Sequence, residues 1–105
     1  METYYWGWRD NDGAAHVRRG SGGVGRPLKP GGFDWGYHNA AASALALAIL
    51  LDVLGDARRA RRLQLVFRVR VIQRLDRGAR WMLTRRAVLD HVAAIDHEQG
   101  LREVS

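Results

Sequence analysis

Side chains near the start of the chain alternate with a period of two, which is typical of a β-strand. Across residues 3–9, one side of this strand carries Tyr4, Trp6 and Trp8. The other side carries Tyr5, Gly7 and Arg9. A turn-forming cluster follows at residues 10–13, and a short return strand is expected at residues 15–19. We therefore expect an N-terminal β-hairpin over residues 3–19.

The next segment, residues 20–32, is rich in glycine and contains both prolines, Pro27 and Pro30. Such a composition favours turns and irregular backbone over helix or strand. We expect a Gly/Pro loop here, which links the hairpin to a helical part over residues 33–100. The segment is not a phosphate-binding loop, because it lacks the Gly-Lys-Ser/Thr ending and does not open a helix.

An apolar segment over residues 40–54 has the signals of a helix at both ends. Asn39 can cap its N-terminus, and Gly55 can end it in a left-handed conformation. Apolar residues occupy nearly every side of this Ala/Leu helix, so we expect it to be the buried central helix. The segment is too short to span a bilayer and is broken by Asp52, so we expect no membrane association.

A second helix is expected to begin after Asp56 and to extend to about residue 74. Its core stripe, at the 3.6-residue period, consists of Ala57, Ala60, Leu63, Phe67, Val71 and Leu75. A thinner apolar strip on another side consists of Leu65, Val69 and Ile72. Residues 65–71 also alternate apolar and basic side chains, which is a strand pattern. The helix is the preferred interpretation.

The rest of the chain predicts a short extended piece at residues 80–83 and a final helix that Thr84 caps and Gly100 ends. Together the elements indicate one domain over residues 1–105 with an α+β fold. In this fold a small N-terminal β-hairpin packs on three α-helices, and the buried Ala/Leu helix lies at their centre.

Charge is concentrated in one part of the chain, although the whole sequence carries only +6. Residues 1–55 are neutral in sum, residues 56–86 carry eleven arginines against two aspartates, and residues 87–105 are net acidic. The arginine guanidinium can bind phosphate or carboxylate through two parallel hydrogen bonds. The basic block predicts a polyanionic partner or an acidic protein surface. The alternative is a solvated helix face that keeps the protein soluble.

The sequence contains no recognisable catalytic or metal-binding constellation. The chain has no cysteine, which excludes disulfides, thiolate nucleophiles and cysteine-based zinc sites and fits a reducing, cytoplasmic location. His91 and His97 are six residues apart on one predicted helix and therefore point to different sides. Asp56 is better explained as a helix cap than as half of a carboxylate pair. We expect a protein that is not an enzyme and uses no metal or cofactor.

The residues expected to bind a partner lie mainly on the second helix. The basic set, which would contact phosphates or acidic side chains, consists of Arg58, Arg59, Arg61, Arg62, Arg68, Arg70 and Arg74. The apolar anchors for a protein partner, or for self-association into a homodimer, are Leu65, Val69 and Ile72. Among the aromatic residues, Tyr5 and Trp8 are the candidates for stacking on bases, whereas Trp35 and Trp81 are expected in the core.

Several short motifs occur in order along the chain, namely Tyr5-Trp6-Gly7, the aromatic box Phe33-Asp34-Trp35-Gly36-Tyr37, the Ala/Leu helix and Trp81-Met82-Leu83-Thr84. They resemble a family of small uncharacterised bacterial, plasmid and phage proteins, and the aromatic box is the most specific part. The chain departs from the family pattern at residues 38–40, which replace a Gly-rich turn, and in its high arginine density. The resemblance implies no particular activity. Its mobile-element setting implies roles in host–parasite conflict.

The sequence thus leads to two functional hypotheses. The first is a small non-catalytic binding module whose Arg-rich helical surface engages nucleic acid or a nucleoprotein complex through phosphate contacts. The alternative is a phage or mobile-element inhibitor of a bacterial defence system, for example an anti-CRISPR protein, that acts by protein–protein binding. The first predicts binding that weakens with salt, and the second predicts a large loss when one apolar anchor is removed.

Overall fold

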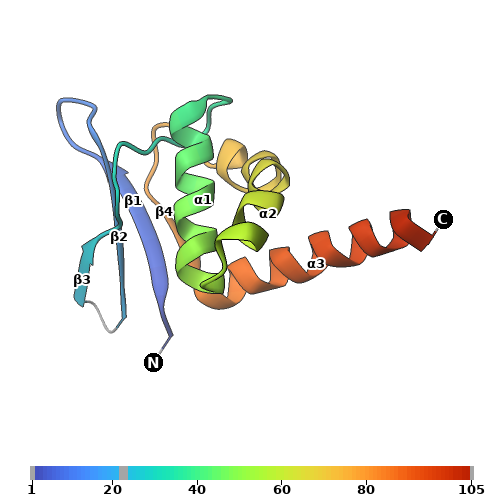
Figure 1. The fold of residues 1–105 in the computed structure, drawn as a ribbon. Coiled ribbons are helices and arrows are strands. Elements are labelled where there is room, and N and C mark those ends of the chain that lie inside the picture. Colours follow the sequence, from blue (N-terminus) through green and yellow to red (C-terminus); the bar gives the residue numbers. More distant parts are fainter. Residues whose placement is uncertain (1, 22–23, 105) are drawn as a thin grey trace.

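Three helices lie on one side of a four-stranded antiparallel sheet in the computed structural model of this protein (Figure 1). The strands are β1 (Tyr4–Arg9), β2 (Ala15–Ser21), β3 (Val24–Pro27) and β4 (Trp81–Thr84). The helices are α1 (Ala40–Leu54), α2 (Ala57–Arg70) and α3 (Arg85–Val104), with a short 3-10 turn, η1 (Ile72–Arg74), after α2. The structure describes residues 2–21 and 24–104, and only the backbone of residues 101–104. The expected α+β class is confirmed.

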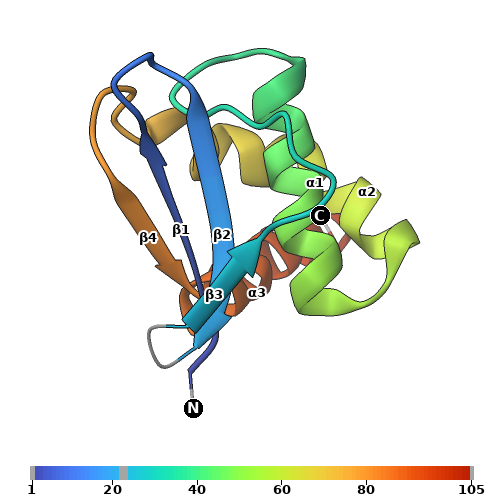
Figure 2. The same cartoon turned by 90° about the vertical axis from the view of Figure 1, so that its left-hand side faces the viewer.

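The sheet is larger than the predicted hairpin. β1 and β2 pair as expected, with Tyr5 opposite Arg19. β2 continues to Ser21 and pairs with β3, so the prediction of a loop throughout residues 20–32 is wrong. β4, which overlaps the extended piece predicted at residues 80–83, pairs with the other side of β1. The strand order is β3-β2-β1-β4, so β3 and β4 form the two edges (Figure 2).

A close backbone contact explains why the glycine-rich segment forms strands. Gly20 in β2 lies against the backbone of Val24 and Gly25, and a Cβ atom at residue 20 would collide with both. Glycine weakens a strand through its conformational entropy, but here it permits the tight approach of β2 and β3. The stability of these strands depends on pairing between two segments, so the composition of residues 20–32 alone does not reveal them.

The central helix α1 has the predicted limits. The Asn39 side chain accepts a hydrogen bond from the Ala42 N–H at 2.9 Å, and Gly55 ends the helix with φ of 67°. Leu45 and Ile49 of α1 are fully buried. The helix therefore forms the centre of the core, as expected from its apolar surface.

The second helix ends one turn earlier than expected. The α-helical part stops at Arg70, Val71 leaves the helix with φ of −120° and ψ of −62°, and the 3-10 turn follows. This break lets both Val71 and Ile72 turn into the core. The Ile72 carbonyl then accepts a hydrogen bond from the Gly36 N–H at 2.8 Å. The strand interpretation of residues 65–71 is wrong, because the segment is helical up to Arg70.

The aromatic box fastens the sheet to the helical part. Trp35 and Trp81 are both buried, as predicted, and their rings meet edge to face with centroids 5.7 Å apart. The Arg9 guanidinium lies over the Trp35 ring, 4.5 Å from its centroid, and forms an ion pair with Asp34. The Trp35 Nε1–H donates to the Asp76 carbonyl at 3.1 Å. The box thus has a structural role.

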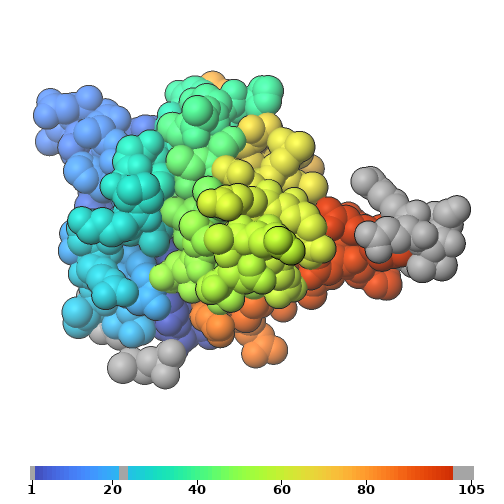
Figure 3. Space-filling model, viewed as in Figure 1, coloured from blue at the N-terminus to red at the C-terminus, as the bar shows by residue number. Residues whose placement is uncertain are grey.

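The last helix packs against α2 and then extends beyond the rest of the molecule (Figures 1 and 3). Thr84 Oγ1 accepts a hydrogen bond from the Ala87 N–H at 3.0 Å, which confirms the predicted cap. The helix does not end at Gly100 but continues to Val104. A glycine inside a helix costs about 1 kcal/mol and does not by itself end it.

Candidate functional site

The side of the sheet that faces away from the helices forms the candidate site (Figure 2). Tyr5 and Gly7 are buried toward the helices, so the alternate residues of β1 point to the open side. The strand register adds residues of β2 and β4 to the same side. We call this surface the outer face, and it consists of Tyr4, Trp6, Trp8, His16, Arg18 and Met82.

The aromatic rings of the outer face are held by contacts within the sheet. The Trp8 ring stacks on His16, with centroids 5.2 Å apart and an interplanar angle of 19°. The Tyr4 and Trp6 rings have centroids 5.2 Å apart at 38°. The Trp6 ring extends over Gly25 of β3, and a Cβ atom at residue 25 would collide with it. These contacts restrict the rings before a ligand arrives, which lowers the entropy cost of binding.

An open hollow of about 670 Å³ lies on the outer face. The Arg18 guanidinium is on the same face and donates to the Gly25 carbonyl at 3.0 Å. Flat apolar walls next to guanidinium groups fit a planar aromatic ligand that carries negative charge. The hollow is lined by Tyr4, Trp6, Gly7, Trp8, Arg80, Trp81 and Met82.

Tyr5, predicted to stack on bases, is fully buried on the opposite side of β1. Its hydroxyl donates to the Asp52 carboxylate of α1 at 2.5 Å, and Arg19 Nε donates to the same oxygen at 2.6 Å. Burial, and then the hydrogen bond to Asp52, raises the pKa of Tyr5 well above its ordinary value of 10.0. The prediction for Tyr5 was wrong because its side of β1 is the side that the helices cover, which leaves the ring no exposed face on which a base could stack.

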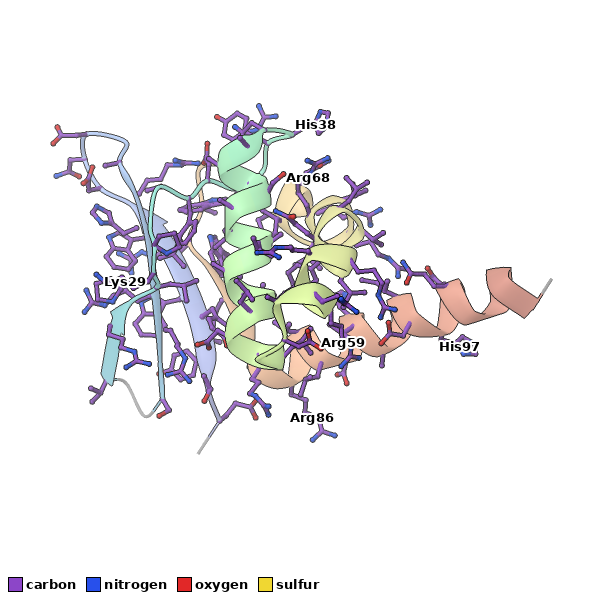
Figure 4. The ribbon with its side chains drawn as sticks, in the orientation of Figure 1. Lys29, His38, Arg59, Arg68, Arg86 and His97 are labelled. Carbon is purple, nitrogen blue, oxygen red and sulfur yellow. The ribbon has the colours of Figure 1, made fainter. Side chains whose placement is uncertain are left out.

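Four of the seven arginines predicted to bind a partner are held by other residues of the chain. Arg59 and Arg62 form ion pairs with Asp96 of α3 at 2.7 and 3.3 Å. Arg59 lies between α2 and α3 (Figure 4). Arg70 pairs with Glu98 at 2.7 Å. The acidic C-terminal segment therefore neutralises part of the basic block.

Arg68 is also bonded within the molecule. Its guanidinium donates to Ser43 Oγ at 2.8 Å and to Gln73 Oε1 at 2.9 Å. The three other predicted arginines are exposed and form no ion pair with a described residue. They are Arg58, Arg61 and Arg74. They do not form one continuous row, because Arg74 lies beyond the end of α2.

The predicted apolar strip on α2 is smaller than expected. Leu65 and Val69 are exposed, with 60% and 44% of their surface accessible. Ile72, predicted as the third anchor, is fully buried. The helix ends at Arg70, and the turn that follows directs residue 72 into the core instead of along the strip.

Five of the six residues of the outer face were not predicted as binding residues, namely Tyr4, Trp6, His16, Arg18 and Met82. Alternation grouped Tyr4 and Trp6 with Trp8 but did not indicate which side of the strand the helices cover. Gly7 carries that signal, since a glycine inside a strand often marks a close approach. The Trp81 indole lies against Gly7 on the covered side, and a Cβ atom at residue 7 would collide with it.

The histidine of the outer face is engaged by a carboxylate. His16 Nε2 lies 2.9 Å from the Asp10 carboxylate, and this hydrogen bond is the first cause of the lowered pKa of Asp10. The described residues contain no group of three or more His, Asp or Glu side chains that could hold a metal ion. None of the helices in residues 2–21 and 24–104 has the length and apolar character needed to cross a membrane.

Residues 5–94 match one known protein family, which is described as Family of unknown function (DUF6166). The matched region extends from β1 into α3 and includes all of the outer face except Tyr4. The comparisons with curated proteins and with solved structures found no match. Because the matched residues make up most of the chain, this protein belongs to the DUF6166 family of unknown function.

Proposed function

We propose that this protein is a non-catalytic module that binds single-stranded nucleic acid on the outer face of its sheet. The observation that carries the proposal is the row of three aromatic residues, Tyr4, Trp6 and Trp8, on the sheet face opposite the helices. Any base can stack on such rings, because every base has a π face. The binding is therefore expected to tolerate many sequences.

The spacing of the rings suits an extended strand of nucleic acid. Side chains two residues apart on one strand are about 6.6 Å apart along it, so the three residues form a row rather than a cluster. The base pairs of a duplex hide their π faces inside the helical stack. The outer face therefore favours a single strand, whose bases can be splayed onto the rings.

Basic side chains around the row supply the contacts to phosphate. Arg18 and Arg80 are on or beside the outer face, and Arg85 and Arg86 are exposed where β4 passes into α3. The whole chain carries +6, which favours a polyanion over a neutral ligand such as a sugar. Contacts of this kind give affinity that falls as salt displaces the protein from the phosphates.

The proposal keeps the predicted class of partner but moves the contact surface from α2 to the sheet. The aromatic ring of the Arg-rich helix, that of Phe67, is buried in the core, and most of the predicted arginines are bonded to α1, α3 or the 3-10 turn. Exposed Arg58 and Arg61 would add only a general attraction for phosphate.

The test is a titration of the full chain with labelled single-stranded DNA, RNA and duplex DNA of one sequence across a salt series. The test variant carries Trp6→Ala and Trp8→Ala, and the control carries Arg58→Gln and Arg61→Gln. Since stacking contributes about 1–3 kcal/mol per base, the tryptophan variant should bind single strands at least about thirtyfold more weakly. The arginine variant should keep most of its affinity.

Circular dichroism and thermal unfolding would establish that both variants are folded. Equal binding of the tryptophan variant and the unchanged chain would overturn the sheet surface. A loss confined to the arginine variant would return the site to α2. Binding of none of the three nucleic acids at low salt would overturn the nucleic-acid function altogether and favour a protein partner.

A further inference from the structure

The edge strand β4 has a neighbour on one side only. In the sheet of the described residues it pairs with β1, and its other side is open (Figure 2). An open strand edge presents N–H and C=O groups that can pair with a further extended segment. The edge is distinct from the outer face, because its binding groups lie in the plane of the sheet.

The register identifies the backbone groups that are available. The Arg85 N–H donates to the Thr3 carbonyl at 2.7 Å, so residue 85 is directed toward β1. By alternation, Leu83 and Trp81 also direct their backbone groups toward β1, opposite Tyr5 and Gly7. Met82 and Thr84 direct their N–H groups, and Met82 its carbonyl, away from β1. The Met82 side chain is 62% exposed.

The two edges of the sheet differ in their protection. β3 includes exposed Arg26 and ends at Pro27, and Lys29 lies two residues beyond its end; proline and charged side chains are common means of blocking an edge. The sequence of β4 is Trp-Met-Leu-Thr, with no charge and no proline. Both edge strands are only four residues long, which limits pairing at either edge, so the two edges differ in charge and proline. The β4 edge is therefore the more open of the two to a further strand.

Charge at both ends of β4 indicates the chemistry of a segment that could pair with it. Arg80 precedes the strand, Arg85 and Arg86 follow it, and all three side chains are exposed without an ion pair to a described residue. Glu2, whose carboxylate accepts from the Arg86 N–H at 3.1 Å, offsets part of this charge. We propose that an extended acidic segment of another protein adds to the sheet as a further strand beside β4.

A second copy of this chain is a poorer fit for the same edge. Antiparallel pairing of β4 with itself would bring Arg80 of one copy near Arg85 of the other, and like charges opposite each other destabilise a strand pair. An acidic partner would instead face arginines at both ends. The proposal does not rest on the nucleic-acid function, since it uses the backbone groups of β4 and not the aromatic rings. The two proposals share only the arginines at the ends of β4, namely Arg80, Arg85 and Arg86.

A display library of random linear peptides, selected against the full chain, tests the proposal. Selected peptides should be acidic and rich in β-branched residues, and their binding should protect the Met82 and Thr84 amides from hydrogen exchange. Met82→Pro removes the outward N–H and leaves the pairing with β1, whereas Met82→Ala removes only the side chain. We expect the Pro variant to bind at least about tenfold more weakly than the Ala variant.

Three outcomes would overturn the proposal: a selection without a binder above background, equal binding of the Pro and Ala variants, or protection of amides elsewhere. A concentration-dependent mass of the protein alone, lost in the Pro variant, would mean that a second copy occupies the edge. If the Pro variant does not fold, the exchange pattern of the unchanged chain still decides the question.

Discussion

The Arg-rich surface of α2 and the outer face of the sheet differ in how their side chains are used. On α2, most of the arginines are bonded to α1, α3 or the 3-10 turn. Arg59, for example, forms an ion pair with Asp96 of α3 at 2.7 Å. On the outer face there are few charges, but three aromatic rings lie on the side without helices. A count of arginines therefore measures charge, whereas a stacking surface needs flat rings on a face that no other layer of the fold covers.

The largest effect is expected from a single ring of the outer face. Trp8→Ala should weaken binding to single-stranded nucleic acid by about 1–3 kcal/mol, because one base loses its stacking partner. Arg61→Ala, on the exposed side of α2, should change the affinity by much less. Titration calorimetry with one oligonucleotide compares the two variants directly. A larger loss of affinity in the Arg61 variant would mean that α2, and not the sheet, is the binding surface.

Substitutions on the two sides of β1 should affect different properties, stability on the buried side and binding on the outer face. Tyr5→Phe removes the hydrogen bond to Asp52, and the free energy of unfolding should fall by about 1.5 kcal/mol while the affinity stays unchanged. Because the pKa of Tyr5 is raised in the folded state, the fold binds this proton more tightly than the unfolded chain. Stability should therefore fall as pH rises above 10.0.

Denaturant unfolding between pH 8 and pH 11 measures this dependence. The Tyr5→Phe variant should lose less stability over that interval than the unchanged chain. An equal loss in both proteins would mean that Tyr5 does not cause the alkaline decline.

A smaller effect is expected from Gly25→Ala. The added Cβ would meet the end of the Trp6 ring, which must move aside. Because the ring is at the surface and can shift, the change in stability should stay near 1 kcal/mol. The affinity for single strands should fall with it, whereas Gly31→Ala, in an open position with positive φ, should affect stability alone. Parallel binding and unfolding measurements distinguish these results.

The smallest effect is expected from a substitution that releases two arginines of α2. Asp96→Asn releases Arg59 and Arg62 from their ion pairs and should cost no more than about 1 kcal/mol of stability, as for other partly exposed pairs. If the sheet is the binding surface, the loss of one negative charge should strengthen binding to nucleic acid only slightly. A steeper salt dependence of binding, measured over a salt series, would instead show that the released arginines contact phosphate.

Elements whose signals are local were predicted well. The limits of α1 follow from a cap at Asn39 and a left-handed residue at Gly55, both next to the helix they bound. The Thr84 cap of α3 is of the same kind. In contrast, the pairing of β2 with β3 depends on a close approach at Gly20, where a Cβ atom would collide with Val24 and Gly25. The end of α2 depends on the burial of Ile72, which composition and periodicity do not encode.

The candidate site shows the same division. The period of two identified which residues share a side of β1, but the packing of Trp81 against Gly7 decides which side is covered. Likewise, the sequence shows Arg59 and Asp96 as opposite charges far apart in the chain, and only the packing of α2 on α3 joins them. Site prediction failed where it needed contacts between distant segments.

The division of the four tryptophans between core and outer face has a practical consequence for spectroscopy. Trp35 and Trp81 are buried, whereas Trp6 and Trp8 lie on the sheet face opposite the helices. Indole emission shifts with the polarity around the ring and is quenched by a stacked base. The unlabelled chain therefore carries two optical reporters, a buried pair that responds to unfolding and a surface pair that responds to a bound ligand.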